Sequence, residues 1–283
     1  MNLQSPAKIN LFLAVTGKRP DGYHNLSTLM CCIGLYDSIH LSFGEKQTTI
    51  NCSHPDVPED KTNLAHRAAT LFYETVKMQE RVHIVIDKKI PVGAGLGGGS
   101  SNAAAVLKGL NTFYNSPLTD NAMIKLGKSI GADVPFFISG KPAHAAGIGD
   151  ILTPFPYLKP YPILLIYPSV PVSTAEVYKK LNLRLTKNKK INTKIFFKLN
   201  KLNWGRDAPK LLYNDLETAA SAICPEIGKA KAVLLKNGAL GALMTGSGSA
   251  VFGIFENFEK AKKAFNAISH HNMWQLYLSH LVV

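Results

Sequence analysis

The sequence contains no apolar run of the eighteen or so residues that a membrane-spanning helix requires. One apolar stretch, residues 162–172, is broken by prolines. Another, residues 9–15, is followed by Lys18, Arg19, Pro20 and Asp21 without a small-residue cleavage site. We therefore interpret residues 9–15 as a strand and not a signal peptide. We expect a cytoplasmic protein with no membrane partner.

Cysteine is scarce. The chain has four, at positions 31, 32, 52 and 224, and they show neither metal-ligand spacing nor a Cys-x-x-Cys pair. We predict buried, reduced thiols, as in proteins of the cytoplasm.

The chain also lacks the common phosphate-binding sequences. It has no Gly-Lys-Ser/Thr of a Walker A loop, and no His-Arg-Asp or Asp-Phe-Gly of a protein kinase. Gly93, Gly95 and Gly98 satisfy Gly-x-Gly-x-x-Gly, but a dinucleotide-binding fold needs an acidic residue at a strand end about twenty residues later. Asp120 is near that distance and lies in a turn and helix start instead. None of the three common loops fits.

What the chain has is a stretch with five glycines among the seven residues 93–99. Alternating apolar residues over 82–86 predict a strand before it. Helical spacing of apolar residues predicts a helix after it, with Ser100 or Ser101 as N-cap. A glycine-rich backbone can turn its amides inward, and a helix N-terminus adds partial positive charge. The stretch therefore predicts a phosphate site, since a flexible linker seldom joins a strand to an amphipathic helix.

The net charge of +13 is concentrated in one segment of this 283-residue chain. Residues 179–210 hold eleven lysines and arginines against one acid, Asp207. Ile191, Ile195, Leu199 and Leu202 recur there at helical spacing, which predicts a basic amphipathic helix. A nucleic-acid or membrane surface is one interpretation. A solvated lysine face fits better, because no recognisable module supplies base-stacking aromatics, and we expect no nucleic-acid partner.

Strands and helices alternate without a long parallel β-α-β series, which predicts an α+β fold in two lobes. The prolines at positions 154, 156, 160 and 162 predict a boundary between a domain of residues 1–153 and one of residues 154–283. Predicted strands cover residues 7–15, 39–43, 49–52, 82–86, 163–167, 240–244, 250–255 and 274–283. Predicted helices begin near residues 62, 100, 119, 173, 214, 225 and 258.

Four further places carry candidate residues, each with a plainer alternative. Lys8 and Asn10 share one face of the first strand, where they either line a cleft or simply face solvent. Tyr23 and His24 follow the turn Arg-Pro-Asp-Gly. Asp133 lies in a turn after Gly131, where an aspartate often only forms an Asx turn. Residues 245–249 are small and join two apolar runs, as a plain hairpin also would.

Taken together, these stretches resemble the GHMP kinase superfamily of small-molecule kinases. Its three motifs match residues 6–11 (Pro-Ala-Lys-Ile-Asn-Leu), residues 91–104, and residues 244–249 (Met-Thr-Gly-Ser-Gly-Ser), in that order. The resemblance runs from about residue 5 to residue 255. It implies a two-lobed α+β fold, with an N-terminal domain like a ribosomal-protein domain and a ferredoxin-like C-terminal domain.

The resemblance also implies roles for individual residues. Asp133 would be the catalytic aspartate and Lys8 the lysine beside it. A Mg²⁺ ion is expected near Ser100 or Ser101. The ATP-binding residues implied are Asn63, Lys88, Pro91, Gly93, Gly95, Leu96, Gly97, Gly98, Gly99, Ser100 and Ser101. The substrate-binding residues implied are Asn10, Tyr23, His24, Tyr178, Thr245, Gly246 and Ser247.

The motifs at residues 19–24 and 131–135 resemble most closely those members that phosphorylate an alcohol carrying cytidine diphosphate. The implied activity is ATP-dependent phosphorylation of a hydroxyl, giving a 2-phospho product in non-mevalonate isoprenoid synthesis. The implied partners are ATP and that alcohol, in a monomer or weak homodimer. The alternatives are a member acting on mevalonate, homoserine or a sugar, which would not be expected to have Asp-Gly-Tyr-His, and a basic RNA-binding protein.

Overall fold

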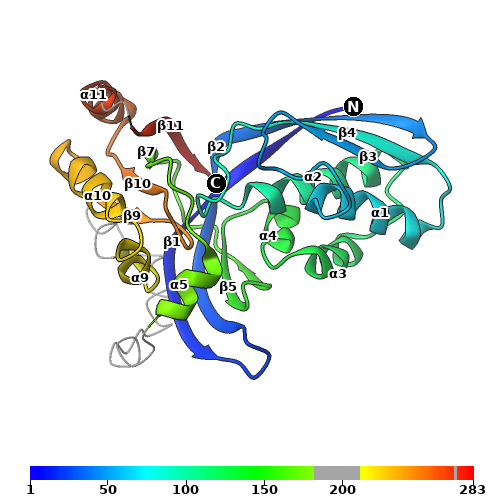
Figure 1. Cartoon of the computed structure of the whole chain (residues 1–283), viewed down its shortest axis with the longest axis horizontal. Helices are drawn as coiled ribbons and strands as arrows, with labels where there is room; N and C mark the ends of the chain where they lie inside the picture. The colour runs from blue at the N-terminus through cyan, green and yellow to red at the C-terminus, as the bar shows by residue number, and fades with distance from the viewer. Residues whose placement is uncertain (182–210, 271–272) are drawn as a thin grey trace. The chain divides into compact units, whose positions relative to one another are not determined.

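The computed structural model describes residues 1–181, 211–270 and 273–283 (Figure 1). These residues form two compact units. The first unit contains residues 1–7, 35–92 and 97–140, and the second contains residues 8–34, 93–96 and 141–283. Strands β1 (Asn2–Lys18) and β2 (His24–Glu45) each contribute to both units. The predicted α+β class is confirmed, and the boundary after residue 153 stays a prediction.

The sheet of the first unit contains β3 (Thr49–Cys52), β4 (Arg81–Asp87) and the second half of β2. β4 lies parallel to β3 and antiparallel to β2, with Ile84 opposite Leu41 and Ile86 opposite Ile39. All four of these side chains are buried. The predicted alternation over residues 82–86 is confirmed, because one face of β4 packs on the core and the other does not.

Four helices complete the first unit: α1 (Leu64–Val76), α2 (Gly98–Phe113), α3 (Asp120–Ile130) and α4 (Val134–Ser139). Side chains cap two of them, since Asn63 accepts from the Ala65 amide at 2.9 Å and Thr119 accepts from the Ala122 amide at 3.3 Å. α1 packs on α2, and each helix buries several alanines. The predicted helix starts near residues 62 and 119 are confirmed.

The predicted N-cap of α2 is wrong. The cap is Gly97, which takes a left-handed conformation (φ 72°), and the helix begins at Gly98. The Ser101 amide already donates to the Gly97 carbonyl at 2.9 Å. Serine at a cap is a common preference, but here a glycine conformation starts the helix three residues earlier. Both serines therefore lie in the first turn of α2.

The sheet of the second unit pairs β11 (Gln275–Val282), β7 (Pro162–Tyr167), β10 (Val251–Ile254) and β9 (Gly241–Met244), all antiparallel. The predicted pairing of β9 with β10 is confirmed. Helices α5 (Thr174–Lys180), α9 (Glu217–Ser221), α10 (Glu226–Lys236) and α11 (Phe258–Ile268) belong to this unit. Its core combines residues from the sheet with α9, α10 and α11, among them Ile166, Ile227 and Ala264.

Several strands of the second unit were not expected. They are the first half of β2, β5 (Ala143–Gly147), β6 (Ile151–Pro154) and the short β8 (Tyr213–Asn214), which lies parallel to β1. The first half of β2 contains a buried run over residues 29–33. Such a run shows no alternation, because both of its faces are covered. The basic amphipathic helix expected around Ile191, Ile195, Leu199 and Leu202 lies outside the described residues.

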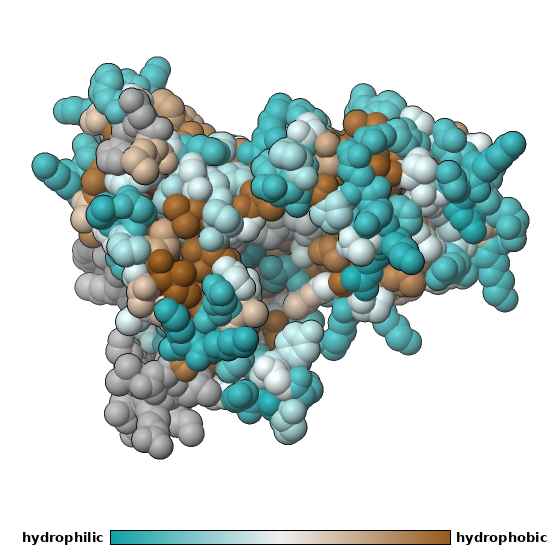
Figure 2. Space-filling view, viewed as in Figure 1, coloured by the Kyte–Doolittle hydropathy of each residue, from teal (hydrophilic) through white to brown (hydrophobic). Residues whose placement is uncertain are grey.

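Among the residues that the structure describes, no helix is long and apolar enough to span a membrane. On the face shown in Figure 2, apolar side chains form small groups among hydrophilic ones. Three of the four cysteines are buried, Cys52 is partly exposed, and none of the four forms a disulfide. Burial raises the pKa of the Cys31 thiol. The prediction of buried, reduced thiols is therefore confirmed for three of the four.

A histidine of β5 makes the stability of the fold sensitive to pH. His144 Nε2 lies 2.9 Å from Ser27 Oγ, and burial lowers the pKa of His144 below its ordinary 6.5. Below that pH the unfolded chain takes up a proton that the folded chain resists. Stability should therefore fall as the pH drops below about 6.5.

His144→Gln should lose less stability than the parent between about pH 7.5 and about pH 5.5. Urea unfolding at the two pH values measures the difference. An equal loss in both proteins would show that His144 does not contribute to the pH dependence.

Candidate functional site

The glycine-rich loop connects β4 to α2, and three of its glycines take left-handed conformations. Gly93, Gly95 and Gly97 have φ angles of 68°, 77° and 72°. Residues with a Cβ rarely adopt such angles, so the alternation of glycine along the loop has a direct conformational cause. The loop therefore turns at every second residue.

Within the second unit, several elements donate amide hydrogens to the loop. Gly93 accepts from Val172 at 3.4 Å, Ala94 from Ala250 at 3.2 Å, and Leu96 from Lys8 at 3.0 Å. A Cβ added to Gly95 would overlap the Thr245 carbonyl oxygen and lie 3.1 Å from the Gly248 nitrogen. The loop is therefore held against the strand that carries Lys8 and against the loop of residues 245–249.

Helix α2 presents its N-terminus directly after the glycine loop. The first amides of a helix have no acceptor within it, and no acidic residue lies in the first turn of α2. Ser101 Oγ is buried, and among the described residues it has no hydrogen-bond partner. Amides and a hydroxyl at the positive end of a helix dipole suit a phosphate group.

The donor set also bears on the expected Mg²⁺ ion. In residues 1–181, 211–270 and 273–283, no three histidine, cysteine or acidic side chains cluster as metal ligands would. Mg²⁺ in phosphoryl-transfer sites usually keeps several waters and binds substrate phosphates through few protein groups. The buried, unpartnered hydroxyl of Ser101 suits that mode, and the residues present are compatible with the ion.

The first unit also brings the expected catalytic turn beside α2. Asp133 is the N-cap residue of α4, and its side chain makes no capping hydrogen bond to that helix. A Cβ at Gly131 would lie 3.6 Å from Ser100 Oγ. The turn that carries Asp133 therefore lies next to the first turn of α2.

Lys8 and Asn10 belong to a chain of buried polar groups in the second unit. Lys8 Nζ donates to Asn10 Oδ1 at 2.7 Å, and Asn10 Nδ2 donates to Thr28 Oγ1 at 2.8 Å. The Asn10 amide donates to Thr245 Oγ1 at 2.9 Å. Lys8 is only 5% exposed. The alternative that both residues simply face solvent is therefore wrong, because β1 is covered on both faces here.

The loop of residues 245–249 is held by a residue for which no role was expected. Asn214 Nδ2 donates to the carbonyls of Met244 and Gly246, both at 2.8 Å. Ser247 Oγ lies 2.8 Å from Thr174 Oγ1. The sequence indicates Asn214 only as a helix start, because these partners of its side chain lie about thirty residues away and are backbone atoms.

Two of the expected substrate-binding residues stack on each other. The rings of His24 and Tyr178 lie 4.8 Å apart with an interplanar angle of 24°. Burial, followed by the charge of Lys18, lowers the pKa of His24. Tyr23 is 60% exposed. The structure thus brings together two aromatic residues that are 154 positions apart, and leaves the ring of Tyr23 accessible.

The remaining expected ATP-binding side chains lie in the first unit. Asn63 caps α1 and also donates to the Pro58 carbonyl at 2.8 Å. Lys88 is paired with Asp37, a residue for which no role was expected. A Cβ at Gly98 would lie 2.9 Å from Lys88 Nζ, so the lysine reaches the start of α2. Contact of Asn63 and Lys88 with a nucleotide stays a prediction.

Family models and relatives of this chain agree with these features. A model described as "GHMP kinases N terminal domain" matches residues 63–141, and one described as "GHMP kinases C terminal" matches residues 190–272. The 4-diphosphocytidyl-2-C-methyl-D-erythritol kinase of Citrifermentans bemidjiense is 41% identical over 97% of this chain and 96% of its own. The enzyme of that name from Syntrophotalea carbinolica is 43% identical, over 96% of each chain. The chain belongs to the 4-diphosphocytidyl-2-C-methyl-D-erythritol kinase family, within the GHMP kinases.

Members of this family are ATP-dependent small-molecule kinases, and so is this chain. A crystal structure of a 4-(cytidine 5'-diphospho)-2C-methyl-D-erythritol kinase matches all of this chain, and is itself matched in full, at 34% identity and a TM-score of 0.84. The mevalonate kinase of Methanococcus jannaschii shares the fold at 18% identity and a TM-score of 0.73, over 100% of this chain and 98% of its own. The expected two-domain GHMP kinase fold is confirmed.

The contact between the glycine loop and the loop of residues 245–249 leaves no space for a side chain at Gly95. Gly95→Ala should lower the free energy of unfolding by at least about 2 kcal/mol, because the substitution combines a disfavoured backbone angle with overlap onto a carbonyl. Gly99→Ala is the matched control, because its Cβ would meet only Leu64 Cδ1 at 3.7 Å. Urea unfolding compares the two, and equal midpoints would contradict the close approach.

Proposed function

We propose that this chain transfers the γ-phosphoryl group of ATP to a hydroxyl of 4-diphosphocytidyl-2-C-methyl-D-erythritol, giving the 2-phospho product. The observation that carries this proposal is identity of 41–43% with enzymes of that name along nearly the whole of both chains. The reaction belongs to isoprenoid precursor synthesis. We further propose that it takes place in the cytoplasm, in a monomer or weak homodimer that binds no nucleic acid.

Asp133 is proposed as the general base. An alcohol is a poor nucleophile at neutral pH, so a carboxylate that accepts its proton as the new bond to phosphorus forms accelerates the transfer. Such a group typically contributes about 10²–10⁴ in rate. The position of Asp133 beside the first turn of α2 supports this role, because the hydroxyl whose proton it accepts has to lie next to the ATP phosphates.

Lys8 is proposed to stabilise the charge on the transferring phosphoryl group. Phosphoryl transfer needs little covalent chemistry from the protein, and depends mainly on positioning and on charge stabilisation. The bond from Lys8 Nζ to Asn10 Oδ1 holds the ammonium in one orientation. The Lys8 amide also binds the Leu96 carbonyl, so the same residue is fixed to the glycine loop.

The amides of the glycine loop and of the first turn of α2 are proposed to bind the ATP phosphates. Ser100 and Ser101 are proposed to lie near a Mg²⁺ ion, which would neutralise phosphate charge when bound. The buried hydroxyl of Ser101 supports this assignment. Asn63 is proposed to lie on the adenosine side, while Lys88, for which the resemblance implies the same side, is held in a buried ion pair with Asp37.

His24, Tyr178 and Tyr23 are proposed to bind the cytosine end of the alcohol substrate. Planar rings stack favourably on a base, and the exposed ring of Tyr23 is accessible to one. Asn10, Thr245, Gly246 and Ser247 are proposed to line the same substrate site. The buried bond between Asn10 and Thr245 supports treating these residues as one group.

The role of Asp133 has a direct test. Asp133→Asn should lower kcat at least about a hundredfold, because the amide cannot accept the proton, while ATP affinity changes little. Steady-state kinetics and calorimetric titration with a non-hydrolysable ATP analogue measure the two effects. Asp120→Asn, at the exposed start of α3, is the control and should behave like the parent. Near-normal turnover of Asp133→Asn would remove the proposed base.

Substrate choice is tested by offering three alcohols with Mg-ATP: the diphosphocytidyl alcohol, mevalonate and homoserine. Phosphate transfer should occur with the first, at a kcat/KM at least about a hundredfold above the other two, because only the first carries a base for the aromatic residues to bind. Preference for mevalonate or homoserine would assign the chain to another GHMP activity. A gel shift with RNA, with and without ATP, tests the RNA-binding alternative.

A further inference from the structure

A fully buried carboxylate, the ion-pair partner of Lys88, has no role in the proposed reaction. Asp37, in β2, has no exposed surface and gave no signal in the sequence. Burying a carboxylate is costly unless charged or polar groups surround it. The partners that Asp37 has are therefore informative about what holds this part of the first unit together.

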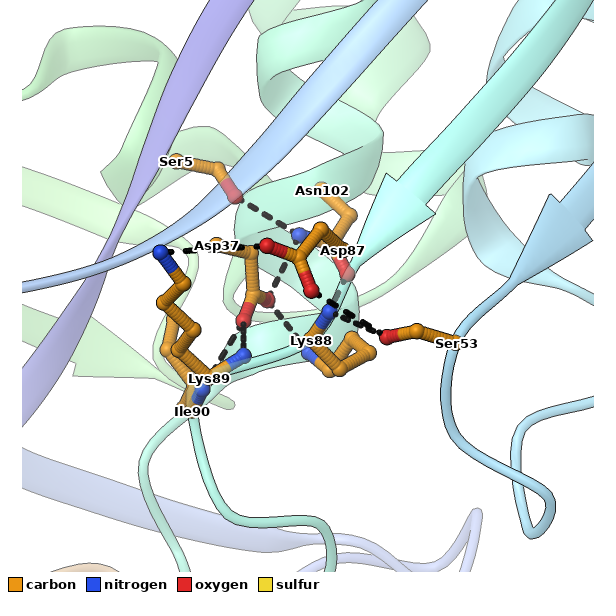
Figure 3. Close-up of polar contacts among 8 residues, drawn as sticks. All are labelled: Ser5, Asp37, Ser53, Asp87, Lys88, Lys89, Ile90 and Asn102. Atoms are coloured by element: carbon orange, nitrogen blue, oxygen red, sulfur yellow. Dashed lines mark hydrogen bonds and ion pairs between the residues drawn. The ribbon is translucent and has the colours of Figure 1, made fainter.

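Asp37 binds the chain where it leaves β4 for the glycine loop. Its Oδ1 accepts from the amides of Lys89 and Ile90, both at 2.8 Å. Its Oδ2 accepts from Lys88 Nζ, in an ion pair whose lysine side chain is only 4% exposed. Three successive residues before the loop are thus fixed by one carboxylate (Figure 3).

The same carboxylate reaches the helix on the other side of the loop. Asn102 of α2 donates its Nδ2 to Asp37 Oδ2 at 2.9 Å and to Ser5 Oγ at 2.6 Å. Its Oδ1 accepts from Lys88 Nζ at 3.3 Å. Lys88 also lies against the first residue of α2, where only a glycine leaves room for it: a Cβ at Gly98 would be 2.9 Å from Nζ.

We propose that Asp37 is a positioning residue for ATP, and that the Lys88 ammonium acts by tying Asp37 to α2 rather than by binding the nucleotide. The proposal rests on the glycine loop and α2 being the phosphate site. A loop rich in glycine loses much conformational freedom when it is ordered. Fixing residues 88–90 and residue 102 sets the separation of its two ends before ATP arrives, which lowers the entropic cost of binding.

If the Asp37 network contributed only to folding, the expected ATP binding of a folded variant would differ. A buried ion pair often adds little net stability over apolar residues of similar size. Replacing both partners can therefore leave the fold intact while the ends of the loop lose their fixed separation. Under our proposal, such a variant folds but binds ATP poorly. If the network serves only folding, a folded variant binds ATP normally.

Asp37→Ala combined with Lys88→Met is the test variant. The matched control changes the exposed neighbouring pair, Asp87→Ala with Lys89→Met, whose charged atoms lie 3.7 Å apart and whose side chains are 57% and 61% exposed. Calorimetry with a non-hydrolysable ATP analogue should show about tenfold weaker binding for the test variant. The control should stay within about twofold of the parent. Hydrogen exchange should accelerate over residues 98–102 of the test variant alone.

Steady-state kinetics separates positioning from loss of active protein. The KM for ATP should rise in the test variant while the KM for the alcohol stays near that of the parent. A folded test variant that binds the analogue as the control does would overturn the proposal. If the double variant does not fold, Asn102→Ala decides, because it keeps the ion pair and removes the tie of that pair to α2, together with the bond to Ser5 Oγ. Weaker analogue binding by Asn102→Ala supports the proposal, and parent-like binding overturns it.

Failure of the proposed function gives a different result. In that case the parent protein itself would not bind the ATP analogue or would not phosphorylate the alcohol. Parent-like binding in the variants, with an active parent, overturns only the role of Asp37.

Discussion

The close approach of two glycines decides how the second unit holds the glycine loop. Gly95 and Gly246 both take left-handed conformations, and a Cβ on Gly246 would lie 2.7 Å from the Gly95 carbonyl oxygen. Neither position has room for a side chain, because a Cβ at either glycine would meet the backbone of the facing loop. Amides from Lys8, Val172 and Ala250 then complete the hydrogen bonding of the first loop. Those contacts require that the loop be ordered before a ligand binds.

Polar side chains are buried around this contact, and those of Lys8, Asn10 and Thr28 are joined by hydrogen bonds. The chain from Lys8 through Asn10 to Thr28 ends on the Phe12 carbonyl, to which Thr28 Oγ1 donates at 2.6 Å. Leaving a buried polar group without a hydrogen bond costs more free energy than a typical hydrogen bond contributes to stability. The ammonium of Lys8 is therefore restricted in direction by its surroundings. In the first unit, the buried side chains of Asp37 and Lys88 form an ion pair, and both bind Asn102.

Regular elements were predictable from the sequence where one face of the chain is buried and the other is not. The alternation of residues 82–86 predicted β4, and the polar caps at Asn63 and Thr119 predicted the starts of α1 and α3. The first half of β2 and the short strands β5, β6 and β8 were missed. Buried runs and two-residue pairings carry no period, so only their partners define them. The N-cap of α2 is Gly97 and not one of the expected serines, because the left-handed conformation of Gly97 starts the helix at Gly98.

In the candidate site, too, some features follow from local sequence patterns and others only from the tertiary structure. The sequence by itself determined the glycine loop, the strand that carries Lys8 and Asn10, the Tyr-His pair after a turn, and Asp133 after Gly131, because each is a local pattern with a local chemical meaning. Only the tertiary structure decided that Asn214 holds the loop of residues 245–249, that His24 stacks on Tyr178, and that Asp37 joins residues 88–90 to Asn102. Those contacts join residues that are distant in the sequence. Hydrogen bonding and burial act across space, and the spacing of residues along the chain does not record them.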